Sequence, residues 1–140
     1  MLNEYSVVLN IDVEKYQKGN LLNEFVEPGK KIKSISIDRI RKFEDDEIVD
    51  VKQEELDEIC YKEKKIILME HSSPFNNRVT MTFENENGFT VKEMFNNIVE
   101  FEKKTRPLTD WFGGVDAHHV YFEGLHFAGE MNTYAPMWGS

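Results

Sequence analysis

The sequence predicts an α+β fold, in which a mainly antiparallel sheet is covered on one face by helix. Several short segments alternate apolar and polar residues with a period of two, which is typical of half-buried strands. A later segment, residues 91–104, carries apolar residues at helical spacing between clear start and stop signals. The 140 residues include no linker and no repeat, so we expect one globular domain over residues 1–140.

The first half of the chain predicts two strands and a helix. Apolar residues alternate with polar ones over residues 5–13, and a β-rich stretch, residues 31–38, follows two turn signals. Residues 53–64 place three apolar residues at helical spacing among charges, which predicts a second helix there.

Two further strands precede the best-marked helix. Residues 66–69 are an uninterrupted apolar run, typical of a strand covered on both faces, and residues 79–83 alternate again. Thr90 and Glu93 then have the spacing of a capping box, in which each side chain accepts a hydrogen bond from the other residue's backbone N–H. Pro107 forbids continuation of the helix. The apolar stripe of this helix comprises Val91, Met94, Phe95, Ile98 and Phe101.

The C-terminal residues predict a hairpin that is closed through residues 128–132. Pro136 restricts the last strand to an edge, or to a place where its missing N–H does no harm. Residues 133–140 carry no charged side chain, and uncharged edge strands are templates for pairing with another chain. Because this segment also holds Tyr134 and Trp138, we predict a homodimer whose interface includes it.

The charge distribution separates classes of partner. A net charge of −9 argues against general binding to nucleic acid, which needs an excess of Lys and Arg on one face. Residues 30–42 hold six bases and one acid, whereas residues 44–58 hold nine acids and one base. This acidic block suits a solvated loop and the outer face of a helix, and its alternative role is the docking of a basic partner.

The composition indicates a folded protein of a reducing compartment. Hydrophobic residues make up 40% of the chain, enough for one core, and no apolar run approaches the ~20 residues that span a bilayer. The N-terminal residues lack the basic start and apolar core of a signal peptide. Cys60 is the single cysteine and suits a small buried residue better than a reactive thiol. We therefore expect an intracellular protein.

The stretch from Asp116 onward contains three of the four histidines, which raises the question of a metal site. On a strand, His118 and His119 would point to opposite faces and could not bind one metal together. Asp116 and His118 are spaced for shared ligation, and a metal-dependent hydrolase would need a third ligand such as His71. Glu123 could then act as general base only if the backbone bends toward the metal.

The same stretch also predicts a recognition surface on one face of a strand. Gly124 suggests a bulge, which would turn Leu125 and Phe127 toward the core and His126 outward. The outer face would then carry the candidate binding residues His119, Tyr121, Glu123 and His126.

Two bulky aromatic residues, Trp111 and Phe112, stand beside two glycines in a loop before this strand. They either plug the end of the core or form an exposed aromatic anchor, the commonest kind of interface hot spot. We therefore count both among the candidate binding residues.

The C-terminal quarter of the chain resembles a known group of proteins. The segment TRPLTDWFGGVDAHHVYFEGLH, residues 105–126, and the terminal MWGS are similar to small uncharacterised proteins of large DNA viruses of amoebae, of the marseillevirus sort. The resemblance implies a viral protein that acts in a eukaryotic host cell, in its cytoplasm or in the virus particle. It implies no activity, ligand or catalytic residue.

No motif in the chain specifies a chemistry. We therefore predict a non-enzymatic binding or structural protein, without cofactor or metal, whose partner is another protein or a second copy of the chain. The alternative is the metal-dependent hydrolase built on Asp116 and His118.

Overall fold

One helix of fifteen residues organises the part of the chain that the structure describes, residues 1–13, 32–70, 79–108 and 116–140. In the computed structural model, short and mainly antiparallel strands wrap around this helix, which confirms the predicted α+β class. The elements in chain order are β1 (Tyr5–Ser6), β2 (Leu9–Val13), β3 (Ile32–Ile37), β4 (Arg41–Glu44), β5 (Glu47–Asp50), α1 (Gln53–Leu56), β6 (Ile59–Tyr61), β7 (Lys65–Met69), β8 (Thr80–Glu84), β9 (Phe89–Thr90), α2 (Val91–Thr105), the 3-10 turn η2 (Arg106–Leu108), β10 (Tyr121–Phe127) and β11 (Thr133–Gly139).

Helix α2 begins where the capping box predicts. The Glu93 N–H donates to the Thr90 hydroxyl oxygen over 3.1 Å, and the Thr90 N–H donates to a Glu93 carboxylate oxygen over 2.9 Å. Pro107 falls inside η2, directly after the helix. In the described residues, no helix is long and apolar enough to span a membrane. The predicted apolar stripe is the buried face of α2, and each of its members, Val91, Met94, Phe95, Ile98 and Phe101, is at most 3% exposed.

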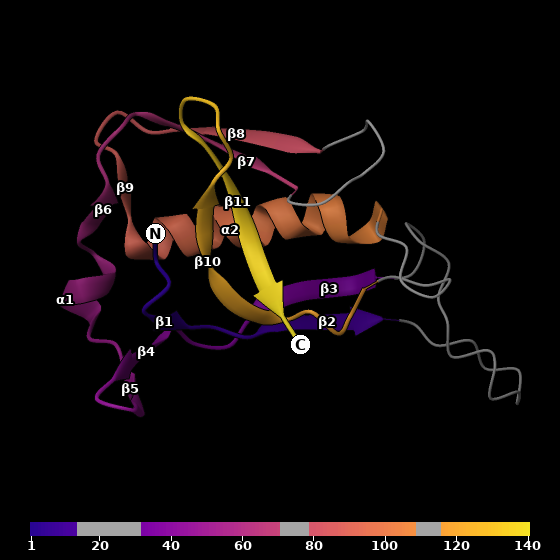
Figure 1. Cartoon of the computed structure of the whole chain (residues 1–140), viewed down its shortest axis with the longest axis horizontal. Coiled ribbons are helices and arrows are strands. Elements are labelled where there is room, and N and C mark those ends of the chain that lie inside the picture. The colour runs from indigo at the N-terminus through magenta and orange to yellow at the C-terminus, as the bar shows by residue number, and fades with distance from the viewer. Residues whose placement is uncertain (14–31, 71–78, 109–115) are drawn as a thin grey trace, which may run out of the picture.

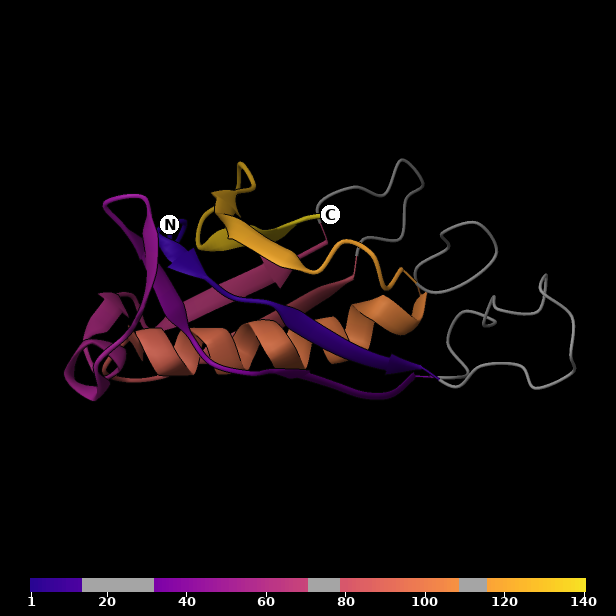
Figure 2. The same cartoon turned by 90° about the horizontal axis from the view of Figure 1, so that it is seen from below.

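The strands surround α2 on several sides. In Figure 1, β7 and β8 lie along the upper side of α2, β10 and β11 cross it, and β2 and β3 run below it. Figure 2 shows the same arrangement from below, with β2 and β3 in front of α2. The four-stranded sheet has the order β10-β11-β7-β8, and β2 pairs with β3. The N-terminal segment joins these two sheets, because the Leu9 N–H donates to the Val120 carbonyl over 2.8 Å and the Phe122 N–H donates to the Val7 carbonyl over 2.9 Å.

The last strand, β11, is not an edge strand, so that form of the prediction is wrong. β11 pairs antiparallel with β10, in the predicted hairpin, and parallel with β7 on its other side. The ladder to β7 ends where Tyr134 pairs with Leu68. Pro136 lies past that point, so its missing N–H removes no bond to β7.

The aromatic residues of the C-terminal segment pack inside the chain. Trp138 contacts Phe122 edge-to-face with the ring centres 5.4 Å apart, and Phe122 contacts Phe95 of α2 at 5.2 Å. Tyr134 packs on Tyr61 at 5.8 Å. Tyr134 and Trp138 are therefore partly buried against the chain's own core, and the homodimer remains a prediction.

The predicted bulge in β10 is present at Gly124. The register with β11 shifts around this residue, whose φ of +107° favours glycine. Leu125 is buried and His126 is exposed, as predicted. Phe127 does not join the core and is 64% exposed. It is the last residue of β10, and its ring contacts Tyr134 across the hairpin in an edge-to-face arrangement with the ring centres 5.8 Å apart.

The helix that we predicted over residues 53–64 is shorter than expected. Only Gln53–Leu56 are helical, and Ile59–Tyr61 form strand β6, which pairs with β9 directly before α2. The Glu58 carbonyl also accepts a hydrogen bond from the Val91 N–H over 3.1 Å. Tertiary pairing decides this segment, because a few apolar residues at helical spacing do not exclude a strand.

The first part of the acidic block forms a hairpin rather than a loop. Strands β4 and β5 join through Asp45 and Asp46, both at positive φ, and β1 completes a three-stranded sheet in the order β1-β4-β5. Glu55 of α1 contacts two strands of this sheet, β1 and β4, through Tyr5 and Lys42. It accepts a hydrogen bond of 2.6 Å from the Tyr5 hydroxyl and lies 3.2 Å from the Lys42 ammonium, and these contacts lower the pKa of Glu55.

Candidate functional site

A buried polar cluster is centred on Arg106, directly after α2. Arg106 Nε donates to Glu102 Oε1 over 2.9 Å, and both side chains are only 4% exposed. Burial raises the pKa of Glu102, and the guanidinium charge offsets part of that shift. Taking both charges out of water is costly, so such a pair requires further hydrogen bonds around the guanidinium.

The other guanidinium nitrogens of Arg106 supply those bonds by binding the turn that precedes β10. Nη1 donates to the Asp116 carbonyl over 2.9 Å, and Nη2 donates to the His119 carbonyl. The guanidinium also lies over the indole of Trp138, 5.5 Å from the ring centre. Arg106 therefore ties the start of β10 and the end of β11 to the end of α2.

The carboxylate of Asp116 closes the same turn. Its Oδ1 accepts hydrogen bonds from the backbone N–H groups of His118 (3.0 Å) and His119 (3.1 Å), and its Oδ2 lies 2.7 Å from Nδ1 of His119. Burial by itself would raise the pKa of Asp116, but these bonds and the charge of Arg106 outweigh burial and lower it. The turn that Asp116 caps therefore keeps the carboxylate ionised.

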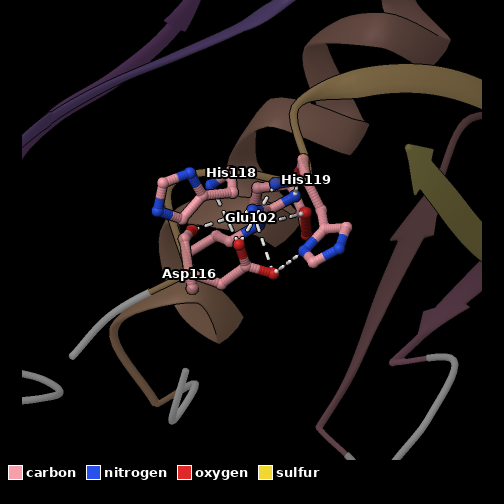
Figure 3. Close-up of polar contacts among 5 residues, drawn as sticks. Glu102, Asp116, His118 and His119 are labelled. Atoms are coloured by element: carbon pink, nitrogen blue, oxygen red, sulfur yellow. Dashed lines mark hydrogen bonds and ion pairs between the residues drawn. The ribbon is translucent and has the colours of Figure 1, made fainter. Parts of the chain in front are cut away.

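The structure does not bring Asp116 and His118 together as metal ligands. Both histidines lie in a turn rather than on a strand, and Figure 3 shows the His118 ring turned away from the Asp116 carboxylate. Both carboxylate oxygens already accept hydrogen bonds, which leaves little capacity for a metal ion. Within the described ranges, no three His, Cys, Asp or Glu side chains are grouped to hold a metal, and His71 lies outside those ranges.

Three of the predicted binding residues share the outer face of β10. Tyr121 is 53% exposed, and Glu123 and His126 are exposed as well. Gly139 of β11 pairs with Tyr121, and the Glu123 carboxylate lies over Gly139, where an added Cβ would come within 2.8 Å of it. His119 does not belong to this face, because it is held in the preceding turn.

Other predicted positions contribute less to the choice of a site. Trp111 and Phe112 lie outside the described residues. Burial raises the pKa of the Cys60 thiol to about 11, so this thiol is protonated at neutral pH and unsuited to nucleophilic attack.

A shallow hollow of about 370 Å³ lies beside the end of the Asp116 turn, and it is lined by Val8, Leu9, Asn10, Ile11, Asp12, Ser34, Ser36, Ala117 and Val120.

The β4–β5 hairpin carries an exposed surface that the sequence interpretation missed. Phe43 and Ile48 stand directly opposite each other, so their side chains share one face, and they are 52% and 49% exposed. Four consecutive acids, residues 44–47, form the hairpin tip between them. The order F-E-D-D-E-I, with apolar residues on both sides of a four-acid turn, was the available signal. We call Phe43, Ile48 and the four acids the hairpin surface.

The described residues of the neighbouring basic stretch, residues 32–42, form no ion pair with this tip. Arg39 pairs with Asp50 at 3.4 Å, and Lys42 pairs with Glu55, so these two bases pair with acids outside the tip. Within the described part of the chain, no ion pair involves the tip residues Glu44, Asp45, Asp46 or Glu47.

Comparisons of the chain with protein-family models, with curated proteins and with solved structures found no match. The functional assignment therefore depends on the geometry described above.

Proposed function

We propose that the chain is a non-enzymatic protein-binding domain whose contact site is the hairpin surface. The observation that supports this proposal is the pair Phe43 and Ile48, which stays about half exposed although both side chains are large and apolar. Fully burying one such side chain stabilises a protein or a complex by roughly 1.5–3 kcal/mol. Because Phe43 and Ile48 are about half exposed, a partner that covers them would gain part of this stabilisation. An aromatic and an aliphatic side chain within a charged rim have the composition of an interface hot spot.

The polar cluster around Arg106 supports a structural role better than a catalytic one. A hydrolase uses a carboxylate–imidazole pair to orient a base toward substrate. In this chain, the Asp116 carboxylate accepts from two backbone N–H groups as well as from His119, and Arg106 binds carbonyls of the same turn. These bonds position the start of β10, so a structural role accounts for the Asp116–His119 pair without a catalytic one.

The outer face of β10 is a second candidate contact surface, supported by the exposure of Tyr121. Either surface suits a viral protein that binds a partner inside a host cell, as the resemblance of the C-terminal quarter implies. A protein partner is the common element of both candidates.

The test is a selection of peptides from a random displayed library on the immobilised protein. The selected peptides are then measured on the double variant Phe43→Ser/Ile48→Ser and on Tyr121→Ser, which removes a matched exposed aromatic residue from the other surface. We expect binding to be lost in the double variant and kept in Tyr121→Ser. Peptides that require Tyr121 would move the site to β10, and peptides that require none of the three side chains would refute the proposal.

A further inference from the structure

The hairpin surface lies next to an open strand edge, and the two together specify the chemistry of a partner. We infer that β5 accepts an extended, basic segment of a partner protein as an additional antiparallel or parallel strand. This inference rests on the proposed function, because it concerns the same surface, and it adds the partner's charge and conformation.

The backbone of β5 has an unpaired edge. The Phe43 N–H donates away from β5, to the Glu4 carbonyl, over 2.8 Å. Residues opposite each other in an antiparallel ladder direct their backbone groups alike, either toward each other or away. Ile48, opposite Phe43, therefore directs its N–H and C=O to the outer edge, and so does Asp50 two residues later. Within the described residues, no strand pairs with that edge.

The side chains beside this edge would hold an added strand. Ile48 stands on the edge strand itself, so a residue of the incoming strand opposite Ile48 would pack directly against it. Phe43 lies one strand further in, on the same face, where only a long side chain of the incoming strand would reach it. An added strand gains main-chain hydrogen bonds from the edge and specificity from alternate side-chain contacts. The half-exposed pair thus lies where such a strand needs a contact.

The charge of the tip selects a basic segment. Glu44 and Glu47 oppose each other across the ladder, and Asp45 and Asp46 join them, so four like charges crowd one turn. Like charges directly opposite destabilise a strand pair, and Lys or Arg side chains on a neighbouring strand would relieve this repulsion. In Figure 1 the hairpin lies at the end of the molecule near α1, away from the crossing of β10 and β11.

The same charges argue against a second copy of the chain as the occupant. Pairing two β5 edges would bring Glu47 and Asp50 of one copy against the same acids of the other. The net charge of −9 adds a general repulsion between copies. The acids beside the β5 edge therefore disfavour pairing with a second copy of the chain and favour pairing with a basic strand.

The probe is a synthetic eight-residue peptide in which Lys and Val alternate, and its binding is followed by calorimetry at low salt. We expect Glu47→Lys to raise the dissociation constant of the peptide about tenfold. Glu130→Lys makes the same charge change in the turn between β10 and β11, and it should change the dissociation constant by less than about twofold. Glu47→Lys should also raise the melting temperature, because it replaces the Glu44–Glu47 repulsion by attraction. Weaker binding by a more stable protein cannot be ascribed to unfolding.

Strand addition is tested with two N-methylated forms of the peptide, methylated at alternate residues in either register. One form blocks the amides that face β5 and should lose binding, and the other should retain it, while the amide resonances of Ile48 and Asp50 shift on binding of the parent peptide. Equal binding by both forms, or equal effects of Glu47→Lys and Glu130→Lys, would overturn the inference. If the displayed library instead yields peptides that need Phe43 and Ile48 but carry no excess of basic residues, the inference fails while the proposed function stands.

Discussion

At the scale of single residues, Arg106 connects the end of α2 to the turn before β10 and to Trp138 of β11. It neutralises buried Glu102 and binds two carbonyls of the turn before β10. Replacing it by methionine leaves Glu102 buried without its counter-charge, so Arg106→Met should lower the free energy of unfolding by about 3–5 kcal/mol. The double variant Glu102→Leu/Arg106→Met should recover part of that loss.

Urea denaturation provides the measurement, with Lys103→Met as the matched control. Lys103 forms an exposed ion pair with Glu100 in the same helix, at 3.0 Å, and removing it should change stability by less than about 1 kcal/mol. Equal effects of Arg106→Met and Lys103→Met would show that the buried cluster does not hold the turn.

Asp116 makes stability depend on pH in the acid range. Its pKa is lowered in the folded protein relative to the ordinary value of 3.8, so it stabilises the fold above that value, and the contribution is lost as the pH falls through the folded pKa. Asp116→Asn should therefore reduce the difference in unfolding free energy between about pH 5 and about pH 2. Urea melts at both pH values test this, and an unchanged difference would mean that other carboxylates account for the acid sensitivity.

At the scale of elements, α2 combines a local start signal with a buried face. Thr90→Ala removes one half of the capping box and should cost about 1 kcal/mol. Phe95→Ala leaves a cavity among Tyr5 and Phe122 and should cost about 3–5 kcal/mol, more than Val91→Ala. The order of the three urea midpoints is the measurement, and a Phe95→Ala midpoint close to wild type would contradict the packing.

At the scale of the whole molecule, β11 is the strand that joins the sheet, since it lies between β10 and β7. Truncation after Asn132 removes this strand and the Trp138 contacts with Phe122 and Arg106. The truncated chain should therefore lose its cooperative thermal transition rather than persist as a folded monomer, and circular dichroism with heating tests this. A sharp transition in the truncated chain would mean that the core does not require the C-terminal segment, and it would support the predicted dimer interface there.

The elements that local patterns specify could be predicted from the sequence, because their signals lie within a few residues of one another. The capping box and apolar stripe of α2, the terminal hairpin and the Gly124 bulge are of this kind. The second candidate surface was predictable, since Tyr121, Glu123 and His126 occupy the expected face of β10, whereas the hairpin surface was not predicted.

The remaining features depend on partners that are distant in the sequence. Pro136 is compatible with an interior strand only because the ladder from β7 stops before it, and residues 59–61 become a strand only because β9 is there to pair with them. The polar environment of Asp116 likewise depends on Arg106, ten residues away, and the exposure of Phe43 and Ile48 depends on which strands fail to cover them. Composition and periodicity describe which face of an element is apolar, whereas only the folded chain determines what that face meets.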